Sequence, residues 1–278
     1  MLTQVVVWLN HIANAIGGFA LAPVAWVPGW LSATIMGIVI GILMLVVFKH
    51  TSNQAAIKRT RDKIKANMLA LSLFKDDLRV SLRCQARLLV GAVMLMVHAL
   101  FPMAVMTIPM VLILGQMSLW YQARPLTDGE ESLVTVTLKE SASDGVDSIE
   151  LVPSDSSTVV AGPVRVRGKH FVCWNVAPTT GGGQDLQFKI DDKLYSKQFS
   201  VGSGFQPTSL KRPSGNLSDM LLHPREAPFA SDSIVQAIEI DYPQRNSFTS
   251  GTNNWVIYWF IVSMLAAILA KPFLNVNI

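Results

Sequence analysis

Among the polar side chains in the long apolar stretches of this sequence, six are of types and positions that could do chemistry there. In hydrocarbon a hydroxyl, amide or imidazole group costs free energy unless it faces protein or water. The six therefore predict helix contacts or a wet groove inside a membrane, although a hydroxyl can instead bond to its own helix backbone. Gln116 and His98 can alternatively lie at a membrane–water interface. The groove-lining candidates are Ser32, Thr34, His98, Thr107, Gln116 and Ser263.

A second candidate site is a run of basic side chains between residues 58 and 65. Such a run is typical of a solvated helix face that also fixes membrane topology. It can equally contact an acidic partner, such as lipid headgroups or ribosomal RNA. The candidates for contact with a client protein, a ribosome or lipid are Lys58, Arg59, Arg61, Lys63 and Lys65.

Motifs for enzymatic chemistry do not stand out. Gly181–Gly183 lacks the Lys-Ser/Thr of a P-loop and predicts a turn. His170 and Asp185 share a region with several serines, but no nucleophile-elbow sequence accompanies them. The histidines lack metal-ligand spacing, and Cys84 and Cys173 are predicted on opposite sides of a membrane, where they cannot pair. The sequence therefore predicts a protein that is not an enzyme and uses no metal or other cofactor.

The composition places these residues in a membrane protein. The chain has 278 residues, of which 50% are hydrophobic and 15% are charged, whereas about 25% of the residues in soluble domains are charged. Lys, Arg, Asp and Glu are absent from residues 1–48, 88–123 and 246–270. Three uncharged stretches of this length exclude a simple soluble enzyme.

The charged residues are distributed asymmetrically along the chain. Residues 49–87 carry ten basic and three acidic side chains, whereas residues 124–245 carry twelve basic and sixteen acidic ones. By the positive-inside rule the first of these segments is cytoplasmic. Residues 1–29 and 122–253 are then extracytoplasmic, and the C-terminus is cytoplasmic. We therefore expect a multi-pass protein of the cell inner (plasma) membrane.

The first 29 residues predict an amphipathic helix that lies in the membrane interface. Apolar residues recur every three or four positions within residues 2–20, which places them on one helical face. A cleaved signal peptide is the alternative, because Ala20-Leu21-Ala22 resembles a cleavage site. Against cleavage, the segment has no basic n-region, and Pro23 follows directly.

The next two segments predict a transmembrane helix and a cytoplasmic hairpin. Residues 30–48 form the expected first span, in which Gly37 and Gly41 make a G-x-x-x-G pair. Such a pair packs closely against another helix, here one of this chain or of a second copy. Residues 49–100 predict a basic helical hairpin with its turn near Ser72–Asp76, where Ser72 or Asp76 caps the second helix.

The second span is expected at residues 101–121. The apolar stretch 88–121 rises about 51 Å as a helix, which exceeds the ~30 Å hydrocarbon core of a bilayer. Pro102 predicts a break that separates the span from the hairpin helix. A start near Leu88 is the alternative.

Beyond the second span the pattern changes to short strands. Residues 122–205 predict an extracytoplasmic β-sandwich-like domain, 206–253 a Pro-rich return segment, 254–273 the third span and 274–278 a cytoplasmic tail. The predicted fold is thus an α-helical membrane protein with three transmembrane helices, a cytoplasmic helical hairpin and this β-domain. The strand-like pieces are Leu133–Leu138, Val164–Arg167, Leu186–Ile190 and Ile234–Ile240.

This order of segments resembles the YidC/oxidase-assembly superfamily of membrane insertases. The resemblance is to its minimal three-span members, the archaeal YidC-like proteins and the insertase subunit of the endoplasmic-reticulum membrane protein complex. FKHTSNQAAIKRTRDKIKANM (48–68) and FPMAVMTIPMVLILGQM (101–117) carry it, and NWVIYWFIVSMLAAILAKPF (254–273) is similar to the ends of uncharacterised bacterial membrane proteins of this layout. Bacterial insertases have an Arg in the groove of their first core span, whereas residues 30–48 contain no charge.

The resemblance implies insertion or assembly of membrane proteins through a polar intramembrane groove. Polar groups and water in the groove would shorten the hydrocarbon path of a client's polar segment. The implied partners are the lipid bilayer, nascent membrane proteins and the ribosome, and no DNA. The alternative is a membrane-anchored structural or adaptor subunit whose extracytoplasmic β-domain binds a protein partner.

Overall fold

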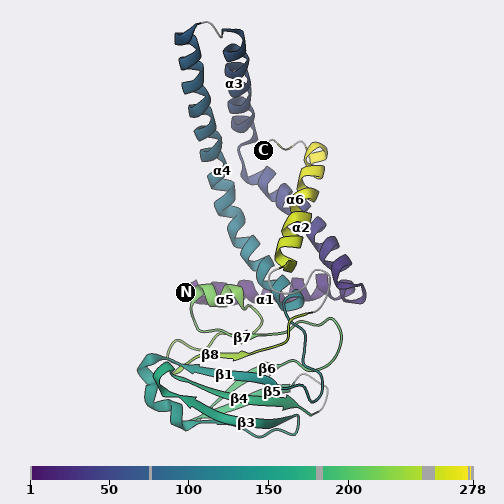
Figure 1. Ribbon diagram of the computed structural model, residues 1–278, viewed down its shortest axis with the longest axis vertical. Coiled ribbons are helices and arrows are strands. Elements are labelled where there is room, and N and C mark those ends of the chain that lie inside the picture. Colours follow the sequence, from purple (N-terminus) through teal and green to yellow (C-terminus); the bar gives the residue numbers. More distant parts are fainter. Residues whose placement is uncertain (1, 75–76, 180–183, 246–253, 275, 277–278) are drawn as a thin grey trace. The chain divides into compact units, whose positions relative to one another are not determined.

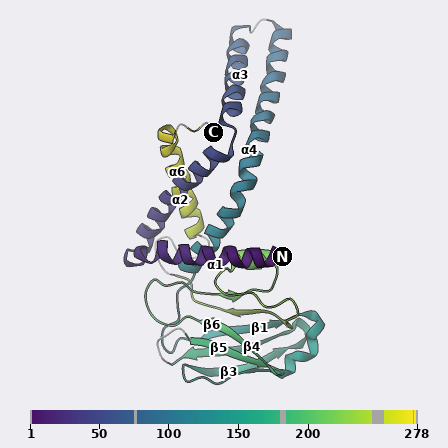
Figure 2. The same cartoon turned by 180° about the vertical axis from the view of Figure 1, so that it is seen from behind.

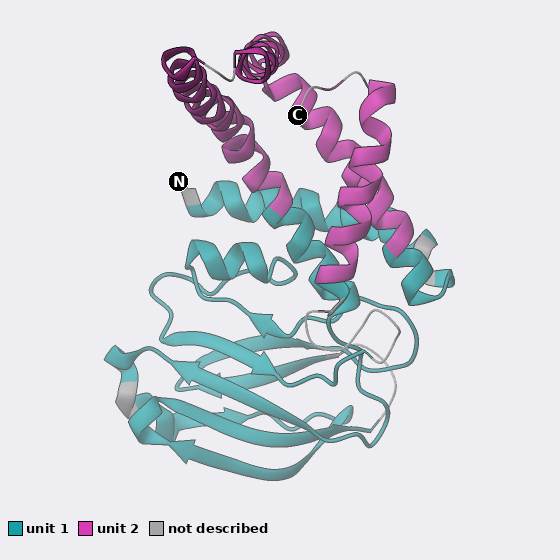
Figure 3. Ribbon diagram, turned by 45° about the horizontal axis from the view of Figure 1, so that its top comes forward, with its two compact units in different colours: residues 1–33, 111–256 teal, residues 34–110, 257–278 magenta. Residues whose placement is uncertain are grey.

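The computed structural model describes residues 2–74, 77–179, 184–245, 254–274 and 276. It divides into two compact units, one of residues 1–33 and 111–256 and the other of residues 34–110 and 257–278 (Figure 3). Its helices and strands define a helical part and a β-domain, as predicted (Figure 1). The helices are α1 (Leu2–Leu21), α2 (Gly29–Thr51), α3 (Gln54–Leu73), α4 (Leu78–Tyr121), α5 (Leu217–Leu222) and α6 (Asn254–Leu274).

Four of these helices are long and apolar enough to cross a membrane, as expected of a membrane protein. Two of them, α2 and α6, lie close to the predicted first and third spans, whereas α4 contains the predicted second span as its last part. The fourth is α1, which meets the same limits of length and composition although we expect it in the interface. Length and composition therefore do not distinguish an interfacial α1 from a spanning one, and the interfacial position stays a prediction.

The helices α3 and α4 form the predicted hairpin, and its turn lies between Leu73 and Leu78 (Figure 1). The cap of the second helix differs from the prediction, because the Asp77 carboxylate accepts hydrogen bonds from the Arg79 and Val80 amides at 2.9 and 3.2 Å. The chain leaves the turn one residue later than expected, and Asp77 satisfies the free N–H groups of the first turn. Ser72 lies inside α3, and Asp76 lies outside the described residues.

The expected helix break at Pro102 is wrong. α4 runs from Leu78 to Tyr121 without interruption and contains both Pro102 and Pro109. A proline removes one backbone hydrogen bond, but an apolar helix in lipid cannot leave its remaining backbone groups without partners. The helix therefore continues through both prolines.

The two glycines of α2 pack against α6 of the same chain. A Cβ placed on Gly37 would lie 2.9 Å from Val262 Cγ1, and one on Gly41 would overlap the Ser263 carbonyl oxygen. Only glycine permits this approach of one helix to the backbone of another. The pair thus faces this chain's own helix, the first of the two alternatives.

The β-domain is a sandwich of two antiparallel sheets. One sheet has the strand order β3-β4-β1-β8-β7 and the other the order β2-β5-β6. The side chains of Val134, Trp174, Phe188 and Ile238 fill the core between them. The strands are β1 (Ser132–Leu138), β2 (Ile149–Leu151), β3 (Ser157–Val166), β4 (Phe171–Pro178), β5 (Gln184–Ile190), β6 (Lys193–Phe199), β7 (Lys211–Arg212) and β8 (Val235–Ile240).

The sandwich extends past residue 205, where we placed its boundary. β8 pairs with β1 on one side and with β7 on the other. Both β7 and β8 come from the segment predicted to be a Pro-rich return to the membrane. The strand-like piece Ile234–Ile240 is therefore an inner strand of the larger sheet. The glycines Gly181–Gly183 lie outside the described residues.

Candidate functional site

The polar face of α1 binds the rest of its unit through three side-chain amides. Asn10 Nδ2 donates to the Met220 carbonyl oxygen at 2.7 Å, and Asn14 Nδ2 donates to that of Pro224 at 2.8 Å. Gln116 Nε2, near the end of α4, donates to Asn14 Oδ1 at 2.6 Å. Figure 2 shows α1 lying alongside α5, next to the sandwich. Asn10 and Gln116 are buried, so this junction excludes water from their amides.

The opposite face of α1 is apolar and exposed. Trp8 has 63% of its surface exposed, Ile16 63% and Phe19 84%, and Val5 is also exposed. A soluble protein rarely leaves so many large apolar groups together on one helix. Since the polar face is bonded to protein, the apolar face of α1 is the one available to lipid.

The hydroxyl candidates in the spans bond within helix pairs or to their own helix. Ser32 Oγ pairs with the Tyr121 hydroxyl group, whose ring packs on Phe205 at 5.2 Å and on Trp255 at 6.1 Å between centroids. Thr34 Oγ1 pairs with the Tyr258 hydroxyl group at 2.6 Å. These contacts tie α2 to α4 in one unit and α2 to α6 in the other.

The remaining candidates bond to backbone carbonyl oxygens one turn away. Thr107 Oγ1 donates to Met103 at 2.9 Å, and Ser263 Oγ donates to Phe260 at 2.9 Å. His98 Nδ1 lies 2.5 Å from the Met94 carbonyl oxygen. Each of the six candidates thus has a partner outside the set. Ser32 and Gln116 lie in one unit, and Thr34, His98, Thr107 and Ser263 lie in the other.

The basic run of α3 lies on the surface of the hairpin. Lys58, Arg59, Lys63 and Lys65 are exposed, and Arg61 is half-buried. Within the described residues, no salt bridge involves these five side chains. Their charges are therefore available to an acidic partner.

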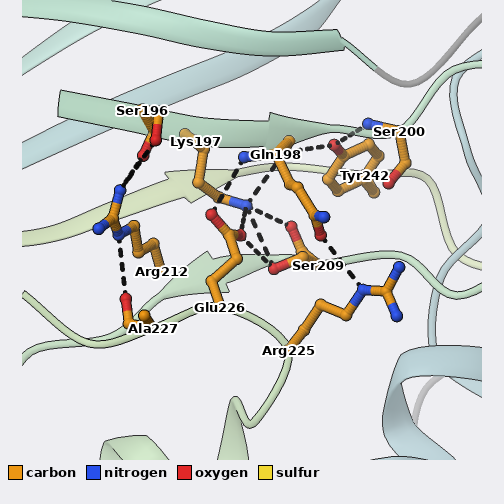
Figure 4. Close-up of polar contacts among 10 residues, drawn as sticks. All are labelled: Ser196, Lys197, Gln198, Ser200, Ser209, Arg212, Arg225, Glu226, Ala227 and Tyr242. Carbon is orange, nitrogen blue, oxygen red and sulfur yellow. Dashed lines mark hydrogen bonds and ion pairs between the residues drawn. The ribbon is translucent and has the colours of Figure 1, made fainter. Parts of the chain in front are cut away.

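A buried ion pair, which was not predicted from the sequence, connects the sandwich to the segment that contacts α1 (Figure 4). Lys197 Nζ lies 2.5 Å from Glu226 Oε1, and none of the Lys197 side chain is exposed. The ammonium group also donates to the Ser209 carbonyl oxygen at 2.6 Å. Glu226 Oε2 accepts a hydrogen bond from the backbone N–H of Gln198 at 3.0 Å. Burial lowers the pKa of Lys197, whereas the Glu226 carboxylate opposes that shift.

Residues 220–228, which we call the junction segment, hold this network and α1 together. The segment offers the Met220 and Pro224 carbonyl oxygens to α1 and the Glu226 carboxylate to β6. The sequence signal for the network was the position of Lys197 in its strand. Lys197 alternates with Phe199 on the inward face, where an unpaired charge is costly.

The side-chain types that most often bind metal ions do not cluster in the described parts of the chain. No group of three or more His, Cys, Asp or Glu residues comes together in the parts of the chain that the structure describes. Cys84 and Cys173 are both free thiols.

Comparisons with known proteins add no family to this description. No family model, no curated protein and no solved structure matches the chain. The class of protein is therefore the one that the fold itself defines, a helical membrane protein with a β-sandwich domain.

Proposed function

We propose that this protein assists the insertion or assembly of other membrane proteins in the bacterial inner membrane. The observation that carries the proposal is the continuity of α4, which runs from a basic two-helix hairpin into a long apolar segment without a break. A client or ribosome that contacts the exposed cations of α3 is thereby brought to the apolar helices. The order of elements also agrees with the resemblance to the YidC/oxidase-assembly superfamily.

The polar groups of the spans would give the client's polar segment a path through the hydrocarbon. The Thr34–Tyr258 contact joins two hydroxyl groups at 2.6 Å, and hydroxyl groups can exchange partners at small cost when a client or water replaces one of them. In lipid the client's polar groups have no such partner. This mechanism needs no nucleotide and no catalytic residue.

Site-specific photocrosslinking in cells tests the proposal. Probes at Thr34, Thr107 and Lys63 should capture nascent membrane proteins or the ribosome. A probe at Leu269, which is 71% exposed on α6, is the matched control and should capture lipid only. If Thr34 and Thr107 also capture only lipid, the groove mechanism is wrong.

A second candidate function is that of a membrane-anchored adaptor whose sandwich binds a protein partner. The observation that favours it is that all six polar candidates of the spans already have partners within the fold. Probes placed in residues 133–200 distinguish the two functions. An adaptor gives one stable crosslinked protein there and no nascent chains at Thr34.

A further inference from the structure

We propose that the outer face of α4 in the hairpin docks an amphipathic helix of a partner protein that carries acidic residues beside its apolar stripe. We call this surface the Leu–Arg face. The proposal is independent of insertase activity, because an anchored adaptor would present the same surface. The face consists of Leu78, Leu82 and Leu89 together with Arg79 and Arg83.

The leucines of this face form an apolar stripe that no described residue covers. Leu78 is 74% exposed, Leu82 56% and Leu89 70%. Their spacing of four and seven residues places them on one side of the helix. At the tip, Leu73 and Phe74 extend this surface around an open hollow of about 540 Å³.

The arginines form a second stripe directly beside the first. Arg79 and Arg83 are spaced four residues apart and are exposed, whereas Arg87 lies on the side of α4 that α3 covers, one turn before Gly91. No salt bridge involves them within the described residues. The nearby carboxylate of Asp77 is engaged by the helix cap. The surface therefore combines an apolar stripe with a positive border whose arginines form no ion pair among the described residues.

α3 covers a different side of α4, so the Leu–Arg face stays free within the hairpin. Cys84 is buried, as is Ile57 of α3. A Cβ on Gly91 would lie 2.6 Å from Ile64 Cγ1, which shows how closely the helices approach there. Counted around the helix at 3.6 residues per turn, Cys84 and Gly91 lie more than a quarter turn from the leucine stripe.

Two other kinds of partner fit this surface less well. The uncharged stretch of α4 begins at Leu88, and Leu78 lies about 15 Å before it along a continuous helix. The tip of such a helix leads away from the bilayer, which argues against lipid. Phosphate groups of RNA would neutralise the arginines but leave the leucines in water. An acidic amphipathic helix covers both stripes, as in other helix-in-groove complexes.

The test uses the full chain in nanodiscs of phosphatidylcholine, a zwitterionic lipid without net charge. The probe is a synthetic 20-residue helical peptide with leucines on one face and glutamates along its borders. The control peptide has lysine at every glutamate position. We expect the acidic peptide to bind about tenfold or more tightly than the basic one. Each glutamate of the acidic peptide attracts the arginines of the face, whereas the lysine at the same position of the control peptide repels them.

Two variants locate the binding. Leu78→Ser with Leu82→Ser should weaken binding of the acidic peptide about tenfold, and Arg79→Glu with Arg83→Glu should reverse the preference between the peptides. Lys58→Glu on α3 is the matched control and should leave the affinity unchanged. These side chains are exposed, so circular dichroism should report the same helical content in every variant.

Three results would overturn the proposal. The first is equal affinity for the acidic and basic peptides. The second is unchanged affinity after the leucine substitutions, since the apolar stripe would then take no part. The third is tighter binding of phosphatidylglycerol vesicles or duplex RNA than of the acidic peptide, which would identify a membrane surface or a nucleic acid as the partner.

Discussion

The Lys197 ammonium group lies 2.5 Å from the Glu226 carboxylate, and this buried contact joins β6 to the segment that accepts hydrogen bonds from α1. The pair links residues 29 positions apart. Glu226 lies two residues after Pro224, whose carbonyl oxygen accepts the hydrogen bond from Asn14. The sandwich and α1 are therefore parts of one connected structure.

Removing one partner of this pair should destabilise the sandwich strongly. Glu226→Gln leaves a buried ammonium group without its counter-charge, which costs about 3–5 kcal/mol in comparable pairs. Adding Lys197→Met removes the charge and should restore part of the loss. Denaturant unfolding in detergent, followed by tryptophan fluorescence, measures the free energy of unfolding of the single and the double variant. Lys193→Met, an exposed lysine of the same strand, is the control. Equal stability of the single and double variants would contradict this reasoning.

Glu130 should make stability depend on pH in the acid range. Arg124 donates to both of its oxygens, at 2.7 and 2.8 Å, and thereby lowers the pKa of Glu130 from 4.5 to about 2. The folded state binds this proton more weakly than the unfolded state does. The stabilisation is therefore complete above about pH 4.5 and is lost as the pH falls towards 2.

The expected size of this effect is about 1 kcal/mol or less, because both side chains are partly exposed and water screens the pair. The measurement is the difference in free energy of unfolding between the wild type and Glu130→Gln at pH 7 and at pH 3. The difference should shrink at pH 3. Glu140→Gln, at an exposed position, should give the same small difference at both values.

Asn14 should be necessary for the attachment of α1. Asn14→Ala removes the donor to Pro224 and the acceptor of Gln116, and each buried polar group left unpaired costs about 1–3 kcal/mol. We expect α1 to become more accessible to protease in nanodiscs, whereas Gln4→Ala, an exposed position on the same helix, should change nothing. Equal protease resistance of the two variants would mean that these hydrogen bonds do not hold α1.

Gly41 should tolerate no side chain. Gly41→Ala places a methyl group against the Ser263 carbonyl oxygen, and such overpacking costs about 1–3 kcal/mol. The Tm in detergent should fall. Gly18→Ala is the control, because nothing lies within 4 Å of a Cβ there and alanine favours the helix. A Tm that is unchanged by Gly41→Ala would show that the two helices separate freely.

Local periodicity in the sequence was sufficient to predict most of the helices and strands. The spacing of three and four residues identified α1, the turn residues separated α3 from α4, and alternation identified β1. These elements depend on neighbouring residues, whose side-chain pattern repeats with the period of the backbone. Pro102 misled because the local cost of proline was outweighed by the hydrogen bonds of a long apolar helix.

Only the tertiary structure decided which faces meet. The sequence marked Gly37 and Gly41 as a packing pair but left the partner open, and the partner is α6. It marked Ile234–Ile240 as strand-like, but the place of β8 between β1 and β7 depends on pairing across about a hundred residues. The pairing of Lys197 with Glu226 likewise depends on how two separate segments pack. A repeating pattern shows which side of an element is apolar, whereas the partner of that side depends on the packing of distant segments.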